Sequence, residues 1–250
     1  MIIKSIKTPK CEPPKIDLFQ VLKNSLPHDS IKEESIIVIA SKIVAIGQGR
    51  CIKIEDVPDK DELIKKEADF YIPRDIVPQG YVMLTIKDNI LIPTAGIDES
   101  NANGYYVLWP EKPFTAAKEI YEFIKKEFGL EKFGVIISDS HTTPLRWGTM
   151  GLAISYWGFY PLRDYRGDKD IFGRQLKITQ SNLADSLAAS AVFMMGEGNE
   201  QTPIAVINDA GPIDFGDFDF EKENPLSIER DNDIYKPLIG GVHWKEGGES

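Results

Sequence analysis

The sequence predicts an α+β protein of mainly antiparallel sheets with flanking helices. Candidate strands do not alternate regularly with helices, as a doubly wound fold requires. Two strand candidates, 81–86 and 89–94, are separated only by Lys87-Asp88, which suits a hairpin connection. No repeat of 20 to 50 residues occurs. The 250 residues are therefore expected to form one domain, 1–250, with two lobes as a variant of that prediction.

The elements before this hairpin follow from apolar spacing. After a short opening strand, Leu18, Phe19 and Leu22 recur at helical spacing. A long apolar run then predicts a buried strand, and a further helical pattern follows Val57-Pro58. The predicted ranges are a helix over 16–26, a strand over 35–46 and a helix over 59–72.

The elements after the hairpin are read in the same way. An apolar stripe predicts a helix that Gly129 ends, and a second helix has Thr179 or Ser181 as its cap and Gly196 as its stop. The predicted ranges are a helix over 114–128, a strand over 133–140, a helix over 182–195 and a strand over 203–209. The acidic tail, 211–250, has little periodicity, so it is expected to be a loosely ordered arm or an interface lid.

Composition excludes several classes of protein. A net charge of −10 argues against a nucleic-acid surface, which needs clustered Lys and Arg, but permits phosphorylated ligands bound through a metal ion. The two cysteines cannot build a disulfide framework. Neither a signal-like apolar stretch at the N-terminus nor an apolar run of membrane-spanning length occurs. We therefore expect a soluble protein of the reducing cytoplasm, without membrane or nucleic-acid partners.

Three acidic residues follow apolar elements: Asp98, Asp139 and Glu197. Element ends hold functional groups rigidly and in reach of solvent. Hard divalent cations prefer such carboxylates together with hydroxyl and amide oxygens, and Asn101 and Ser140 stand nearby in the sequence. The alternative is that each is an ordinary turn or capping residue, and for any one alone that alternative is the stronger.

Two further segments suit anionic ligands. The glycine-containing loop 196–203 could approach a phosphate closely, or be a plain helix end and turn. The segment 161–179 carries Arg163, Arg166 and Arg174, which could bind carboxylates or phosphates. It could equally be an exposed hairpin with Asp-Arg pairs.

Five segments, in order along the chain, resemble one family, the coenzyme F420:L-glutamate ligases, also called F420-0:gamma-glutamyl ligases. These segments are "ASKIVAIGQGR" at 40–50, "AGIDESN" at 95–101, "GVIISDS" at 134–140, "PLRDYRGDKDIFGRQLKIT" at 161–179 and "ADSLAASAVFMMGEGNEQTPIAVI" at 184–207. The resemblance implies an amide ligase that joins L-glutamate to the carboxylate of a deazaflavin coenzyme precursor. It implies GTP as co-substrate, two Mg²⁺ or Mn²⁺ ions with K⁺ as a further candidate, and an intertwined homodimer of gamma-glutamyl ligase-like fold.

The resemblance also implies roles for individual residues. Asp98 and Asp139 correspond to ligands of one metal ion, and Ser140 and Glu197 to ligands of a second. The nucleotide contacts correspond to the segment 9–12, Ser41, Lys42, Asn101 and the loop 195–202, with Met195, Gly196, Gly198 and Asn199. Forming an amide at neutral pH needs an activated acyl group, for which an acyl phosphate serves. The anionic substrates need counter-charges, which we assign to Arg146, Arg163, Arg166 and Arg174 as catalytic residues.

The chain departs from the family pattern at two places. Ile46 stands where the family has a lysine, so either Lys42 supplies the phosphate contact or nucleotide binding differs. The segment 140–148 has Ser140 in place of threonine and lacks the family's Gly-Arg pair. Two alternatives therefore stay open: the same chemistry on another acceptor such as a folate, and a non-catalytic nucleotide- or coenzyme-binding homologue.

Overall fold

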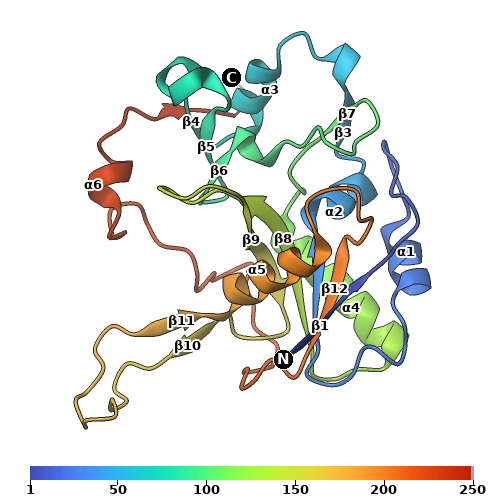
Figure 1. Ribbon diagram of the computed structural model, residues 1–250, viewed down its shortest axis with the longest axis vertical. Coiled ribbons are helices and arrows are strands. Elements are labelled where there is room, and N and C mark those ends of the chain that lie inside the picture. Colours follow the sequence, from blue (N-terminus) through green and yellow to red (C-terminus); the bar gives the residue numbers. More distant parts are fainter. Residues whose placement is uncertain (249–250) are drawn as a thin grey trace.

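A five-stranded sheet forms the centre of the protein, as the computed structural model shows (Figure 1). The structure describes residues 1–248. The strand order is β1-β12-β2-β8-β9. The strands are β1 (Ile2–Ile6), β2 (Ile36–Ala40), β8 (Gly134–His141), β9 (Met150–Trp157) and β12 (Ile204–Asn208). Strand β9 was not predicted from the sequence.

One pair of neighbours in this sheet, β2 and β8, is parallel, and the other pairs are antiparallel. In the parallel pair Ile36 lies opposite Gly134 and Ala40 opposite Ser138. Parallel strands end at the same edge of a sheet, so the residues after Ala40 and after Ser138 meet there. Ligand sites form at such carboxyl ends. The fold class is α+β as predicted, with a mixed central sheet.

Helices cover both faces of this sheet (Figure 1). Helix α5 (Leu183–Met195) crosses one face, and α4 (Pro113–Phe128) lies on the other, with α1 (Leu18–Ser25) packed beside it. Helix α5 lies very close to β9, because a Cβ on Gly151 would stand 2.6 Å from the Ala188 carbonyl oxygen. The predicted stop at Gly129 is confirmed, with φ of 68°. The cap of α5 is Asn182, whose side chain accepts from the Asp185 N–H, and neither Thr179 nor Ser181.

The apolar run at 35–46 is a strand followed by a helix, and its prediction as one strand was wrong. Strand β2 ends at Ala40, and α2 (Ser41–Gln48) begins at the next residue. Most of α2 is buried, so its sequence has no polar face to reveal a helical period. Strand β2 is buried on both sides, with Ile36 and Ile39 fully inaccessible, which explains its uninterrupted apolar run.

A second sheet, ordered β13-β4-β5-β6, is fully antiparallel. The predicted helix over 59–72 is shorter, because α3 ends at Glu67 and strand β4 follows. The hairpin connection is Asp88-Asn89, one residue later than predicted, and both residues have positive φ, which this turn demands. The elements are α3 (Lys60–Glu67), β4 (Phe70–Ile72), β5 (Leu84–Lys87), β6 (Ile90–Pro93) and β13 (Lys245–Glu246), with 3₁₀ turns at Ile54–Asp56, Arg74–Ile76, Pro78–Gly80 and Thr94–Gly96. Strands β3 (Cys51–Lys53) and β7 (Tyr105–Val107) pair beside this sheet.

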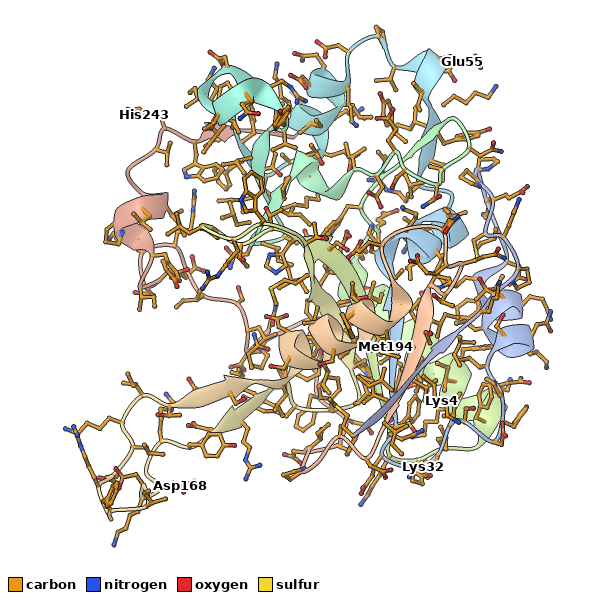
Figure 2. The ribbon with its side chains drawn as sticks, viewed as in Figure 1. Lys4, Lys32, Glu55, Asp168, Met194 and His243 are labelled. Carbon is orange, nitrogen blue, oxygen red and sulfur yellow. The ribbon has the colours of Figure 1, made fainter. Side chains whose placement is uncertain are left out.

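A hairpin arm projects from the body (Figure 1). It consists of β10 (Leu162–Asp164) and β11 (Gln180–Asn182) with the long connection between them. Figure 2 labels Asp168 at the outer part of this arm, well away from the central sheet. The segment 161–179 is therefore an exposed hairpin, and its binding of carboxylates or phosphates stays a prediction.

The C-terminal tail packs against the body rather than lying loose. Phe220 is 4% exposed among aromatic side chains of the core, and the Tyr156 hydroxyl and the Asn224 side-chain oxygen lie 2.5 Å apart. After α6 (Lys236–Ile239), strand β13 pairs with β4 and so ties the tail to the second sheet. Throughout the described part of the chain, every helix is too short or too polar to cross a membrane.

Candidate functional site

A cleft of about 540 Å³ opens where β2 and β8 end. Sites for small ligands span roughly 300–1,000 Å³, so this volume suits one. Every residue that the sequence predicted for metal or nucleotide binding lines it. These residues are Ser41, Lys42, Asp98, Asn101, Asp139, Ser140, Met195, Gly196, Glu197, Gly198 and Asn199. The structure thus brings together four segments that are far apart in the sequence, and the segment 9–12 lines the same cleft.

Asp139 and Asp98 both line the cleft. Burial, and then repulsion from the Asp98 carboxylate, raise the pKa of Asp139 to about 7, although hydrogen bonds from Ser140 and Ser41 and the charge of Lys42 oppose this rise. Asp98 is held by backbone hydrogen bonds in both directions with Val107, and its carboxylate lies 3.0 Å from the Lys42 ammonium. A carboxylate whose charge is disfavoured by a second carboxylate nearby offers a place that suits a cation.

Ser140 and Glu197 form a second pair. The Ser140 hydroxyl oxygen lies 2.7 Å from a carboxylate oxygen of Glu197. Ser140 belongs to the end of β8, and Glu197 directly follows the glycine that ends α5. This contact therefore joins the end of a strand to the end of a helix, which fixes the separation of two oxygen-bearing side chains.

The donor set fits hard divalent cations. It consists of carboxylate and hydroxyl oxygens, which Mg²⁺ and Mn²⁺ prefer. Within residues 1–248, no three His, Cys, Asp or Glu side chains are gathered into a preformed metal cluster. Two protein ligands at each position would leave the other coordination places to phosphate oxygens and water, which is the usual way Mg²⁺ is bound beside a nucleotide.

Helix α2 supplies the basic side of the cleft. Its N-terminus faces the cleft with Ser41 and Lys42, where the helix dipole favours anions. The Lys42 ammonium also donates to the Ser100 carbonyl at 3.0 Å. Ile46, one turn further along the helix, is 1% exposed and packs among apolar residues. Since residues four apart share a helix face, Lys42 is the residue of α2 able to supply the charge missing at Ile46.

The loop after α5 closes the opposite side. The Asn101 side chain donates to the Gly198 carbonyl at 2.8 Å, which ties this loop to the segment carrying Asp98. Gly196 has φ of 80°, and a Cβ there would lie 2.5 Å from the Glu200 side chain. The Glu200 carboxylate accepts from the Gly198 N–H at 2.8 Å. Thus the Gly198 N–H of this loop points toward an anionic oxygen, at present that of Glu200.

The four predicted arginines do not line the cleft. Arg146 lies in the exposed connection between β8 and β9. The other three lie on the arm, where Arg166 pairs with Asp164 and Arg163 stacks on the Tyr165 ring at 4.8 Å. Arg174 is exposed, and its guanidinium has no partner among the residues that the structure describes. Their role as counter-charges stays a prediction.

Sequence reasoning missed several residues of the cleft. Thr8 lines it and is joined to the loop after α5, because its N–H donates to the Gln201 carbonyl and the Gln201 side chain donates back. Ser138, one residue before Asp139, also lines the cleft. Ser138 is the first polar residue after an apolar run in the sequence, and this position was the signal that could have identified it as a residue of the cleft.

Comparisons with known proteins place the chain beside one family. The model of one family, described as F420-0:Gamma-glutamyl ligase, matches residues 5–209. The coenzyme F420:L-glutamate ligase of Methanocaldococcus jannaschii is 33% identical over 219 residues, which cover 82% of this chain and 86% of that protein. Proteins of the same name from Methanopyrus kandleri and Halorubrum lacusprofundi are 31% and 30% identical, over 78% and 80% of this chain and 82% and 84% of theirs.

Proposed function

This chain belongs to the F420-0:gamma-glutamyl ligase family, and we propose that it is the ligase that joins L-glutamate to a carboxylate of a coenzyme F420 precursor with GTP and divalent metal ions. Membership makes it an amide-forming ligase. The carrying observation for the nucleotide and metal is the convergence of Asp98, Asp139, Ser140 and Glu197 on one cleft that also presents the N-terminus of α2.

The chemistry proposed for this cleft has two steps. The acceptor carboxylate takes the γ-phosphoryl group from GTP, which forms an acyl phosphate and leaves GDP. The α-amine of L-glutamate then attacks the acyl carbon, the amide bond forms, and inorganic phosphate leaves as the amine loses a proton. Divalent ions, when bound, neutralise the charge that develops on the phosphate oxygens.

The chain's own residues have distinct parts in this proposal. Asp98 and Asp139 would hold one ion, while Ser140 and Glu197 would hold the other. Lys42 and the first turn of α2 bind phosphate oxygens through charge and backbone donors. The apolar part of the wall, with Val192 and Met195 from α5, receives the base and excludes water around it.

The arm supports a homodimer within this proposal. Ile171 is 92% exposed and Phe172 is 88% exposed, and both lie beside Arg174 on a hairpin that projects from its own chain. Exposed apolar groups of this kind mark contact surfaces. Docking of each arm on a second copy would cover them and would bring arginines toward the partner's substrates.

The test uses purified protein with GTP, Mn²⁺, L-glutamate and F420-0. Mass spectrometry should detect the acceptor with one added glutamyl residue. Phosphate release should require both the acceptor and L-glutamate. The acyl phosphate forms only on the acceptor, and it releases phosphate only when L-glutamate attacks it. Folate monoglutamate in parallel tests the alternative acceptor. Nucleotide binding without any product or phosphate from either acceptor would contradict the ligase and favour a binding homologue.

A further inference from the structure

The hydroxyl of Ser138 is buried and has no hydrogen-bond partner within residues 1–248. Ser138 is 1% exposed. Buried hydroxyls are almost always paired, since a lost hydrogen bond leaves the cost of desolvation uncompensated. A serine in this state therefore needs a reason, and alanine at the same place would spare the fold this cost.

The position of Ser138 supplies that reason. It lines the cleft at the carboxyl end of β8, opposite Ala40, the residue that immediately precedes α2. Side chains alternate along a strand, so Ser138 shares a face with Ser140 and not with Asp139. Ser138 thus lines the cleft between Ala40, which precedes α2, and Ser140, which contacts Glu197.

The surroundings of Ser138 select an anionic oxygen as its partner. Basic and N–H donor groups converge at this end of the cleft, from Lys42, from the first turn of α2 and from the loop after α5. Val192 and Met195 line the same cleft from the α5 side and offer no strong hydrogen-bond donor or acceptor in their side chains. The Ser138 hydroxyl has its hydrogen bond still to donate, and a small shift of the surrounding side chains on binding would bring it within reach of a ligand oxygen.

We propose that Ser138 is a nucleotide-binding residue whose hydroxyl donates a hydrogen bond to a phosphate oxygen of the nucleotide. This inference rests on the proposed function and adds to it a contact from the end of β8. It also assigns a cost to the site: in the free protein the hydroxyl lowers the stability of the fold, and the bound phosphate restores the missing partner.

The experiment compares Ser138→Ala with Ser25→Ala. Ser25 is the matched control, since it carries the other buried hydroxyl without a partner in the described chain, at the end of α1 and outside the cleft. Thermal unfolding of each metal- and nucleotide-free protein gives its stability. Titration with GTP in Mn²⁺, by calorimetry and by the shift of the unfolding midpoint, gives the affinity. The kcat and KM for GTP are then measured separately.

The two variants should differ in a defined way. Both should unfold at the wild-type temperature or above it, because each loses a hydroxyl that had no partner. Only Ser138→Ala should bind GTP more weakly, by about tenfold, as expected for a lost hydrogen bond to a charged group. Its KM for GTP should rise by a similar factor.

Three results would overturn the proposal, each recognisable by itself. Wild-type affinity in Ser138→Ala would show that the hydroxyl does not contact the nucleotide. A markedly lower unfolding temperature of the free Ser138→Ala protein would show a structural role. Failure of the wild-type protein to bind GTP would refute the proposed function and this contact with it, whereas the first two results leave the ligase proposal intact.

Discussion

The cleft and the arm hold their charged groups in opposite ways. In the cleft, Asp98, Asp139 and Glu197 come from three distant segments and are fixed by contacts with Lys42 and Ser140. In the arm, charged residues lie within one hairpin, mostly exposed. There the Arg166 guanidinium forms an ion pair with the Asp164 carboxylate, two residues away.

The difference teaches which charges are ready for a ligand. The central sheet already holds the groups of the cleft in place, so binding of a ligand would lose little conformational entropy in ordering them. The arm's free guanidinium, on Arg174, needs a second surface before it can meet a substrate. We therefore expect substitutions in the cleft to act strongly and in every assay, and substitutions in the arm to act weakly and only in an assembled protein.

The largest effect is expected for Asp139→Asn. Loss of one charged metal ligand should lower glutamate-dependent phosphate release by about 100-fold or more, because metal ions contribute several kcal/mol to such reactions. Circular dichroism should show an unchanged fold. The control is Glu99→Gln, an exposed neighbour of Asp98 whose carboxylate pairs with Lys60 at 2.9 Å. Normal turnover of Asp139→Asn at saturating Mg²⁺ or Mn²⁺ would contradict the metal assignment.

Lys42→Gln should have an intermediate effect, which weakens the binding of GTP and strengthens the binding of Mn²⁺. GTP affinity should fall by about tenfold, since a charge-assisted contact with phosphate is lost. Mn²⁺ binding without nucleotide should tighten, because the Lys42 ammonium no longer competes for Asp98 at 3.0 Å. Calorimetry measures both affinities, with Lys60→Gln as control. Equal weakening of both ligands would mean that Lys42 mainly supports the fold.

Arg174→Ala should have a smaller effect, which depends on assembly. We expect KM for an anionic substrate to rise about fivefold, or ~1 kcal/mol, when the protein is dimeric. The matched control is Arg166→Ala, whose charge is already paired within the arm. Steady-state kinetics beside light scattering, over a range of protein concentrations, checks this. An unchanged KM in a dimeric Arg174→Ala protein would remove the arm from the site.

The smallest effect is expected in the pH dependence of folding stability. It differs in sign between Asp185 in the body and Asp164 in the arm. Burial raises the pKa of Asp185, at the start of α5, above its ordinary 3.8, although bonds from Ala153 and Asn182 oppose this. The stability linked to Asp185 is therefore full below its unfolded pKa and is lost as pH rises through the folded pKa. Arg166 lowers the pKa of Asp164, so there the stability is present above the unfolded pKa and is lost as pH falls through the folded pKa.

Denaturant unfolding between pH 3 and pH 6 checks these opposite signs. Asp185→Asn should gain stability relative to wild type as pH rises, on top of a constant loss from its altered hydrogen bonds. Asp164 is fully exposed, so Asp164→Asn should follow the wild-type profile nearly throughout. Parallel profiles for wild type and Asp185→Asn would contradict the raised pKa.

Local patterns in the sequence predicted most of the elements but not their arrangement. Helix α4 and strand β8 followed from spacing and from Gly129. Strand β9 did not, because the register with β8 shifts between Ile137 and Ser138 and leaves Ile154 unpaired. An extra residue of this kind breaks the alternation of side chains on which strand prediction rests.

The candidate site was predictable only through resemblance. Asp98, Asp139 and Glu197 each looked like a turn residue, and their convergence depends on the parallel pairing of β2 with β8, which no local pattern encodes. The likeness to the family supplied that long-range information. It said nothing of Ser138, whose missing partner is visible only when the packing around it is known.

The parallel pairing of β2 with β8 also determines at which stage of folding the cleft can form. Ala40 and Ser138 stand opposite each other although roughly 100 residues separate them, and a contact across so long a loop forms late in folding because its closure costs entropy. Strands β4, β5 and β6 of the second sheet and helix α4 lie within that loop. The cleft exists only once β2 and β8 have paired, so a molecule in which this pairing has not formed would lack the place proposed for phosphate.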